Sequence, residues 1–360
     1  MGLTSEADLH IELGLTVVKR DARLEKRHMD PRYAKLAENI GLGHSERIAG
    51  LFAMLADTTD ADIMLAMPGQ PGAIADKLGL TEEEVTGRIQ DLFIKGVAFP
   101  STKTDPPTWR MCRDLVQFHD ASLLWPQAPE EFYDLWRDYM NNEWFGLAKT
   151  IAKTTPKPFT RVIPVDVSIE ARTHVMPFES VQEIIENAKS ISVTKCTCRL
   201  SMRQCDRPLE ACLQVNKAAD YNIARGTGRP LNKDEALQLL KDFEEAGLIH
   251  VTMNRAEADN FICNCCPCCC QTMPVLLKGG IHVIDPSRFV ASIDPDECSG
   301  CGACHERCYF GAISWSDGEG SVSLVDPGKC MGCGLCLVTC PDEAIELNET
   351  REPEFVPGAA

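Results

Sequence analysis

Apolar residues recur at helical spacing in the segment that follows Thr81. Three consecutive glutamates come directly after this threonine, and Gly96 ends the pattern. A threonine N-cap, carboxylates in the first turn and a terminal glycine are typical of a helix between these two residues. Four apolar side chains are predicted to form its buried face: Val85, Ile89, Leu92 and Phe93.

The sequence around this helix, about residues 60–112, has a characteristic order. PGAIADKLGL precedes the helix, and VAFPSTKTDPPTWRM, which is rich in proline near its middle, follows it. Helix, turn, helix and hairpin in this order resemble a winged helix-turn-helix domain. The three glutamates stand where a recognition helix would meet phosphates, which opposes DNA binding. We therefore expect a winged-helix-like scaffold used for packing or for docking a partner.

An aromatic segment, FYDLWRDYMNNEWFGLAK, predicts an amphipathic helix. Residues 154–164, TTPKPFTRVIP, are the best candidate for a linker, because proline removes a donor and restricts the residue before it. Residues 1–150 are therefore predicted to form a helical region. Four large side chains of the aromatic segment suit a core or an interface better than a cofactor site: Trp136, Tyr139, Trp144 and Phe145.

Beyond the linker, a helix followed by a strand occurs twice. FESVQEIIENAKS predicts a helix, and the strand ISVTK then leads directly to Cys196. Asn232 opens a later helix, with Glu235 placed to complete a capping box, and the strand LIHVTM then leads to Cys263. We expect these two units to meet around one metal site in a domain of residues 165–285.

The composition is that of an ordinary globular chain, with 360 residues, 44% hydrophobic and 25% charged. The first residues lack the continuous apolar stretch of a secretory signal, and no run approaches the ~18 apolar residues of a membrane span. We therefore expect a cytoplasmic protein with no membrane span.

The chain has nineteen cysteines and a formal net charge of −17, and both limit the range of possible functions. The cytosol keeps thiols reduced, and these cysteines crowd into short runs, so metal binding explains them better than disulfides. Nucleic acid is an unfavourable partner because its phosphates are held mainly by Lys and Arg.

The strongest motif is a cysteine run with the spacing CxxCxxCxxxC that occurs twice near the C-terminus. The first run starts at Cys298, and the second starts at Cys330 and ends in Cys340-Pro341. Short CxxCxxC turns place three sulfur atoms at three corners of a cubane cluster, and the fourth ligand comes from elsewhere. Closed zinc sites use CxxC pairs instead, so iron-sulfur clusters are favoured.

Residues 289–348 closely resemble bacterial 2[4Fe-4S] ferredoxins. The resemblance includes the triplet GAI after the first run and the triplet EAI after the second. The resemblance implies that each cluster takes three cysteines from one run and the last cysteine of the other. Tyr309 is a departure, because the second run has proline at that place. The implied ligands of the first cluster are Cys298, Cys301, Cys304 and Cys340, and those of the second are Cys330, Cys333, Cys336 and Cys308.

Glycines of the two runs fit this interpretation, since backbone must approach the inorganic sulfides closely and donate N–H bonds to them. These glycines are Gly300, Gly302, Gly332 and Gly334.

Ten further cysteines lie upstream of the ferredoxin segment. The sequence from CTCR to FICNCCPCCC, placed before a dicluster ferredoxin, resembles multi-cluster ferredoxin-like proteins of anaerobic bacteria. The resemblance implies one or two additional iron-sulfur clusters; structural zinc is the main alternative. The candidate ligands are Cys196, Cys198, Cys205, Cys212, Cys263, Cys265, Cys266, Cys268, Cys269 and Cys270.

Two other residues have competing interpretations. His250 lies in a predicted strand and is either an iron ligand of the Rieske type or a hydrogen-bonded histidine. Cys112 stands alone and is expected to be a small buried side chain. The chain has no dinucleotide-binding glycine fingerprint and no Walker loop, and we expect no nicotinamide or ATP site of its own.

Together these patterns predict an α+β protein with an N-terminal winged-helix-like helical domain, a cysteine-rich helix-strand domain and a C-terminal bacterial 2[4Fe-4S] ferredoxin fold over residues 286–350. The expected function is single-electron transfer, as a non-catalytic protein or subunit of a cytoplasmic oxidoreductase complex of anaerobic metabolism. The expected partner is a flavin or nicotinamide subunit. Two alternatives are a redox-sensing winged-helix regulator and an enzyme with an open-site cluster.

The acidic charge should steer electropositive partners toward the ferredoxin segment. The carboxylates expected to contribute are Asp294, Asp296, Glu297, Asp317 and Glu319.

Overall fold

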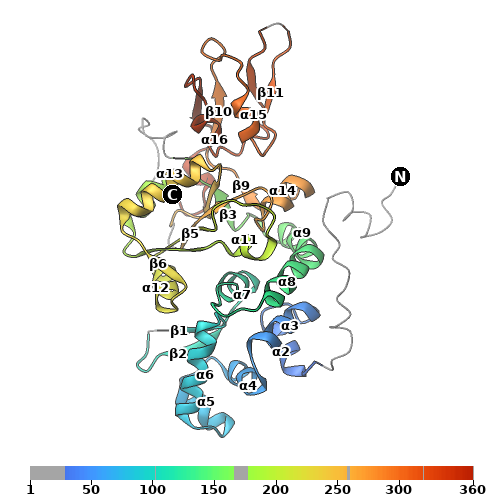
Figure 1. Cartoon of the computed structure of the whole chain (residues 1–360), viewed down its shortest axis with the longest axis vertical. Helices are drawn as coiled ribbons and strands as arrows, with labels where there is room; N and C mark the ends of the chain where they lie inside the picture. The colour runs from blue at the N-terminus through green and yellow to red at the C-terminus, as the bar shows by residue number, and fades with distance from the viewer. Residues whose placement is uncertain (1–28, 102, 166–176, 258–259, 319, 360) are drawn as a thin grey trace, which may run out of the picture. The chain divides into compact units, whose positions relative to one another are not determined.

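The computed structural model describes residues 29–101, 103–165, 177–257, 260–318 and 320–359 (Figure 1). The chain divides into two compact units. The first contains the chain up to Phe145 and two short later segments, Leu200–Met202 and Arg225–Thr227, and the second contains the remainder.

Helices dominate the first unit, and one hairpin follows them. The hairpin strands pair antiparallel from Ala98 opposite Met111 to Ser101 opposite Thr108. The elements in chain order are α2 (Pro31–Asn39), α3 (Glu46–Leu55), α4 (Thr58–Ala66), α5 (Pro71–Leu78), α6 (Glu82–Ile94), β1 (Ala98–Ser101), β2 (Thr108–Met111), α7 (Leu115–Ser122), α8 (Glu130–Tyr139) and the π-helical turn η1 (Met140–Trp144).

The predicted helix after Thr81 is confirmed as α6. The Thr81 hydroxyl oxygen accepts a hydrogen bond from the Glu84 backbone N–H at 3.2 Å. The four apolar residues of its predicted face are all buried. Gly96 has φ of +83°, and a Cβ there would lie 2.4 Å from the Ala121 carbonyl oxygen, so the position requires glycine.

Aromatic packing forms part of the core of the first unit. Trp136 is fully buried between Phe118, at a centroid distance of 5.1 Å, and Tyr139, at 5.9 Å. Trp144 and Phe145 are only partly buried. The predicted amphipathic helix is not continuous, because α8 passes through η1 into α9 (Phe145–Thr154).

A seven-stranded sheet organises the second unit. Its strand order is β6-β4-β5-β8-β7-β3-β9, and only the β3–β9 pair is parallel. The strands are β3 (Thr160–Val162), β4 (Ile191–Lys195), β5 (Glu210–Val215), β6 (Gly228–Pro230), β7 (Ile249–Met253), β8 (Phe261–Cys265) and β9 (Ile284–Asp285), and the helices around them are α10 (Val181–Asn187), α11 (Thr197–Met202), α12 (Lys217–Ala224), α13 (Lys233–Glu245) and α14 (Met273–Gly279).

Both predicted helix-strand units are confirmed, as α10 with β4 and as α13 with β7. Asn232 and Glu235 form the predicted capping box at the start of α13. Apolar residues of α10 and α13 share one buried core with residues of β4, β5 and β8. The linker prediction for 154–164 was wrong in part, because Thr160–Val162 forms a strand inside the sheet, between β7 and β9. Hydrogen bonds to both neighbouring strands and the burial of Arg161 and Val162 outweigh the effect of the flanking prolines.

The ferredoxin segment contains two antiparallel strand pairs (Figure 1, orange to red). The first pair joins the two ends of the segment, with Phe289 opposite Glu349 and Ile293 opposite Ile345. One short helix follows the first strand of the segment and another follows the third strand, and each helix contains a cysteine. The elements are β10 (Phe289–Ile293), α15 (Ala303–Arg307), β11 (Ile313–Trp315), β12 (Ser323–Val325), α16 (Leu335–Val338) and β13 (Ile345–Glu349); the 3-10 turns η3 (Pro177–Glu179) and η4 (Pro353–Phe355) lie outside it.

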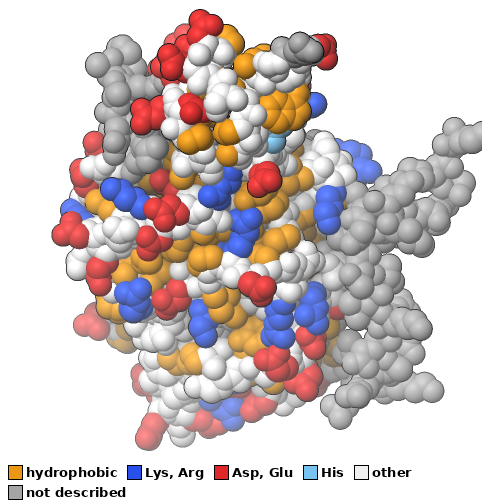
Figure 2. All heavy atoms as spheres, turned by 45° about the horizontal axis from the view of Figure 1, so that its top comes forward, with side chains coloured by type: hydrophobic (Ala, Val, Ile, Leu, Met, Phe, Trp, Pro, Cys, Tyr) orange, Lys and Arg blue, Asp and Glu red, His pale blue; other side chains and the backbone are white. Residues whose placement is uncertain are grey.

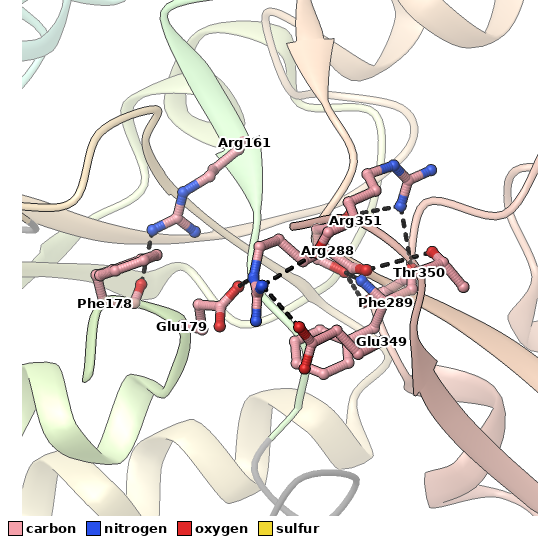
Figure 3. Close-up of polar contacts among 10 residues, drawn as sticks. Arg161, Phe178, Glu179, Arg288, Phe289, Glu349, Thr350 and Arg351 are labelled. Carbon is pink, nitrogen blue, oxygen red and sulfur yellow. Dashed lines mark hydrogen bonds and ion pairs between the residues drawn. The ribbon is translucent and has the colours of Figure 1, made fainter. Parts of the chain in front are cut away.

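Arg288 connects the ferredoxin segment to the residues before α10 (Figure 3). Its guanidinium contacts the Glu179 carboxylate at 2.6 Å and the Glu349 carboxylate at 2.8 Å. The side chains of Arg288 and Glu179 are only 1% and 3% exposed. A buried charge is costly unless it is paired, so the position of one segment depends on the other.

We expect Arg288→Met to lower the free energy of unfolding by about 3–5 kcal/mol, because it leaves the buried Glu179 carboxylate without this cation. Urea unfolding of anaerobically purified protein measures the change. The matched control is Arg229→Met, which removes an exposed pair with Glu210 at 3.6 Å and should cost less than about 1 kcal/mol. Equal losses in the two variants would contradict the role assigned to Arg288.

Candidate metal centres

The eight cysteines of the ferredoxin segment line two separate cavities. Each cavity is lined by three cysteines from one run and the last cysteine of the other run. The first is lined by Cys298, Cys301, Cys304 and Cys340, and the second by Cys330, Cys333, Cys336 and Cys308. The structure therefore brings together the two sets that the sequence predicts.

Backbone around the cavities is shaped by glycines with positive φ. Gly300, Gly302, Gly332 and Gly334 all have φ between +64° and +78°. A Cβ at Gly332 would lie 2.2 Å from the Phe289 carbonyl oxygen, and one at Gly300 would lie 2.8 Å from the Ser321 carbonyl oxygen. Only glycine fits these positions, which allows the loops to curl tightly around each cavity.

Backbone amides also donate to cysteine sulfur atoms. The Ala291 N–H lies 3.4 Å from Cys330 Sγ, and the Ala312 N–H lies 3.3 Å from Cys308 Sγ. Such N–H donors stabilise thiolate ligands. Sulfur ligands, close backbone and N–H donors around two cavities fit two iron-sulfur clusters.

The two cavities differ in exposure. Cys301 of the first set is exposed to solvent. In the second set, burial raises the pKa of Cys333 to about 12. The Cys333 carbonyl oxygen also accepts a hydrogen bond from the Val165 N–H at 3.0 Å, in the segment after β3. The second set therefore packs against the sheet, and the first lies toward solvent.

A family model for the 4Fe-4S dicluster domain matches residues 291–347. This part of the chain is a 4Fe-4S dicluster domain. Such a domain carries two [4Fe-4S] clusters, and the cysteines and glycines described above fit them. No curated protein and no solved structure matches the chain. Within the described residues, no helix combines the length and the apolar character that crossing a membrane requires.

The other cysteines of the second unit come from neighbouring elements of the sheet. Cys196 follows β4, and Cys198 lies in α11. Cys212 on β5 is directly opposite Cys263 on β8, with their Sγ atoms 4.0 Å apart. Cys205 lies in the loop between α11 and β5. Strand β8 ends at Cys265, and four more cysteines follow before α14. Antiparallel pairing therefore gathers sulfur atoms from distant parts of the sequence.

One group of four sulfur atoms lies close together, with all of them within 4.8 Å of one another. Cys205 Sγ lies 3.9 Å from Cys266 Sγ and 3.8 Å from Cys269 Sγ. Cys268 Sγ lies 3.8 Å from Cys269 Sγ. We call these the four-thiol group: Cys205, Cys266, Cys268 and Cys269.

A second group lies beside it and uses different cysteines. Cys270 Sγ is 3.5 Å from Cys265 Sγ, and Cys198 hydrogen bonds with both Cys270 and Cys196. Hydrogen bonding with Cys198 and Cys265 holds the pKa of Cys270 well below its usual range. We call Cys196, Cys198, Cys265 and Cys270 the inner group. Adjacent cysteines of the turn thus contact different partners, since Cys270 contacts Cys265 while Cys269 contacts Cys205. The expectation of one metal site stays a prediction.

Arg199 is a buried cation next to both groups. It donates hydrogen bonds from Nη1 and Nη2 to the Asn264 carbonyl oxygen, each at 3.0 Å, and it also hydrogen bonds with Cys266. The pKa of Cys266 is lowered to about 5, chiefly by a hydrogen bond from Cys269 and in part by Arg199. Sequence reasoning missed this arginine, although it directly follows the CTC triplet.

His250 is buried with both ring nitrogens in hydrogen-bonding contact. Nδ1 lies 2.6 Å from Asn264 Oδ1, and Nε2 lies 3.1 Å from Glu244 Oε1. Of its two interpretations, the hydrogen-bonded one describes this geometry, since a metal ligand needs a nitrogen lone pair directed at the metal. Cys112 is 2% exposed, which confirms the expectation of a small buried side chain.

Tyr309 connects the ferredoxin segment to the cysteine-rich part. Its hydroxyl group accepts a hydrogen bond from Arg207 Nη2 at 2.7 Å and donates one to the Gly247 carbonyl oxygen at 3.1 Å. Arg207 itself donates to the Ala246 and Gly247 carbonyl oxygens. A proline, which the second run has at this place, has no such group, so the departure from the repeat has a structural reason.

We expect the last cysteine of each run to serve the opposite cluster. The EPR spectrum of reduced Cys308→Ser should therefore change in the same way as that of Cys333→Ser, and the spectrum of Cys340→Ser in the same way as that of Cys301→Ser. Each pair shares a cavity, so each pair alters one cluster and leaves the other unchanged. The opposite pairing of spectra would show that each run holds its own cluster.

Proposed function

We propose that this protein transfers single electrons as a component of a cytoplasmic oxidoreductase complex, through its dicluster domain and a third iron-sulfur site at the inner group. The dicluster domain supports the electron-transfer chemistry. The observation that carries the wider proposal is the packing of the inner group against the second cavity. When bound, iron-sulfur clusters supply reversible one-electron redox chemistry.

The ligand assignment follows the two cavities. We propose Cys298, Cys301, Cys304 and Cys340 for the first cluster and Cys330, Cys333, Cys336 and Cys308 for the second. The support is that each set lines one cavity whose loops contain glycine at the positions of closest approach.

Apolar packing joins the inner group to the second cavity. Cys265 and Cys270 belong to a buried cluster of side chains that also contains Leu335, with Cys333 and Met331 packed against it. Burial lowers the local dielectric and excludes water, both of which tune the potential of a metal site. This continuity supports a role for the cysteine-rich part in electron transfer instead of a separate function.

The first cavity provides the solvent-facing end. Besides the exposed Cys301, the surface there carries exposed carboxylates at Asp294, Asp296 and Glu297, and Asp317 is exposed farther along. Acidic side chains gather at the upper end of the molecule in Figure 2. The fifth predicted carboxylate, Glu319, lies outside the described residues. We propose that an electropositive redox partner, such as a flavin or nicotinamide subunit, approaches this end.

For the first unit we propose a winged-helix-like scaffold that packs or docks a partner. Glu82, Glu83 and Glu84 are exposed in the first turn of α6, where they repel phosphates. The basic residue of this helix surface, Arg88, is paired with Asp60 at 2.8 Å and with Asp57 at 3.0 Å. Its charge is therefore already balanced, which disfavours the alternative of a DNA-binding regulator.

We expect oxidation of the reduced protein by a cationic cytochrome to slow as salt rises from low to physiological concentration. Exposed charges are screened over about 8 Å at physiological ionic strength, and the carboxylates near the first cavity lose their steering effect. Stopped-flow absorbance measures the rate. The oxidation rate of the triple variant Asp294→Asn, Asp296→Asn, Glu297→Gln should depend less on salt. Oxidation by a small neutral oxidant is the control, since no charge steers that encounter. A rate independent of salt in the unmodified protein would refute steering and favour a permanently docked subunit.

We expect Cys198→Ser and Cys270→Ser to lose iron and acid-labile sulfide equivalent to about one cluster, while the EPR signals of the dicluster domain remain. The reason is that both cysteines belong to the inner group and neither lines a ferredoxin cavity. Cys112→Ala is the matched control, since Cys112 is the one cysteine that belongs to the first unit and its thiol is buried. This variant should change neither the iron content nor the sulfide content. Full iron and sulfide in both inner-group variants would exclude this site.

A further inference from the structure

We propose that the four-thiol group binds a single zinc ion, separate from any iron-sulfur cluster. This site does not depend on the proposed electron transfer. Ten upstream cysteines are more than one cubane needs, and the structure sorts four of them into a compact set. The set is defined by the sulfur atoms that lie close together in the structure. The order of the cysteines in the sequence does not show which atoms these are.

The spacing of the sulfur atoms fits one tetrahedral ion. Four thiolates bound to zinc at about 2.3 Å lie about 3.8 Å from one another, by the geometry of a tetrahedron. In the structure the separations are 3.9 Å for Cys205 to Cys266, 3.8 Å for Cys205 to Cys269 and 3.8 Å for Cys268 to Cys269, and all four sulfur atoms lie within 4.8 Å of one another. A cubane binds each cysteine at a different iron and holds inorganic sulfides between them, so it needs sulfur ligands that stand farther apart.

The ferredoxin cysteines supply the comparison within the same chain. Each set of four lines a cavity, with loop backbone curled around it. In the four-thiol group all four sulfur atoms instead lie within 4.8 Å of one another, and among the residues that the structure describes no other set of metal-ligating side chains is gathered so closely. The two kinds of arrangement therefore suit two kinds of metal centre.

The local sequence also has the form of a closed zinc site. Cys266 and Cys269 are a CxxC pair, the usual chelating unit of structural zinc, and Cys205 comes from a distant loop. The Gln204 backbone N–H donates to Cys269 Sγ at 3.3 Å, and Arg199 hydrogen bonds with Cys266. These donors offset the negative charge of four thiolates on one divalent ion. The ion would connect the loop before β5 to the turn after β8.

The test is the metal content of full-length protein purified without oxygen from zinc-containing medium. We expect about one zinc ion per chain. Cys205→Ser and Cys268→Ser should lower zinc at least fivefold while iron and sulfide stay at the level of the unmodified protein. Cys301→Ser is the converse control and should lose iron but keep zinc. Loss of iron in the Cys205 or Cys268 variants, or absence of zinc from the unmodified protein, overturns the proposal.

A measurement on the unmodified protein covers the case in which the serine variants fail to fold. Zinc-edge X-ray absorption should give four sulfur neighbours at about 2.3 Å. Nitrogen or oxygen neighbours in place of any of the four would identify adventitious zinc and overturn the proposal.

Discussion

Antiparallel pairing of β4, β5 and β8 determines where the sulfur atoms of the cysteine-rich part lie. Cys212 is opposite Cys263 because β5 and β8 are in register there, and Cys196 and Cys265 stand at the ends of β4 and β8. Metal centres of this kind take several thiolate ligands, and the hydrogen bonds of the sheet bring these cysteines close together. The core under α10 and α13 stabilises the same three strands.

Buried arginines balance the charge that the thiolates and carboxylates bring into the interior. Arg199 lies beside the four-thiol group, and Arg288 joins the ferredoxin segment to Glu179. Tyr309 and Arg207 add hydrogen bonds between the ferredoxin segment and the residues that end α13. These contacts keep the second cavity close to the inner group, which is the feature on which the proposed electron transfer relies.

The proposed metal centres of this unit differ in the arrangement of their sulfur ligands. Cavities surrounded by glycine-rich loops suit clusters that exchange electrons, and a compact tetrahedral set suits an ion with no redox chemistry of its own. A difference in exposure separates the two cavities, since Cys301 is exposed and Cys333 is packed against the sheet.

The sequence alone determined the features that depend on local spacing. Two CxxCxxCxxxC runs identified the dicluster domain, and Thr81 and Asn232 identified helix starts, because a cap or a short chelating turn is complete within a few residues. The tertiary structure decided what depends on distant partners. Thr160–Val162 became a strand because β7 and β9 lie on either side of it. Both nitrogens of His250 are engaged by residues outside its strand. The grouping of eight of the ten upstream cysteines depends on which sulfur atoms contact one another, and the spacing in a run of adjacent cysteines does not determine those contacts.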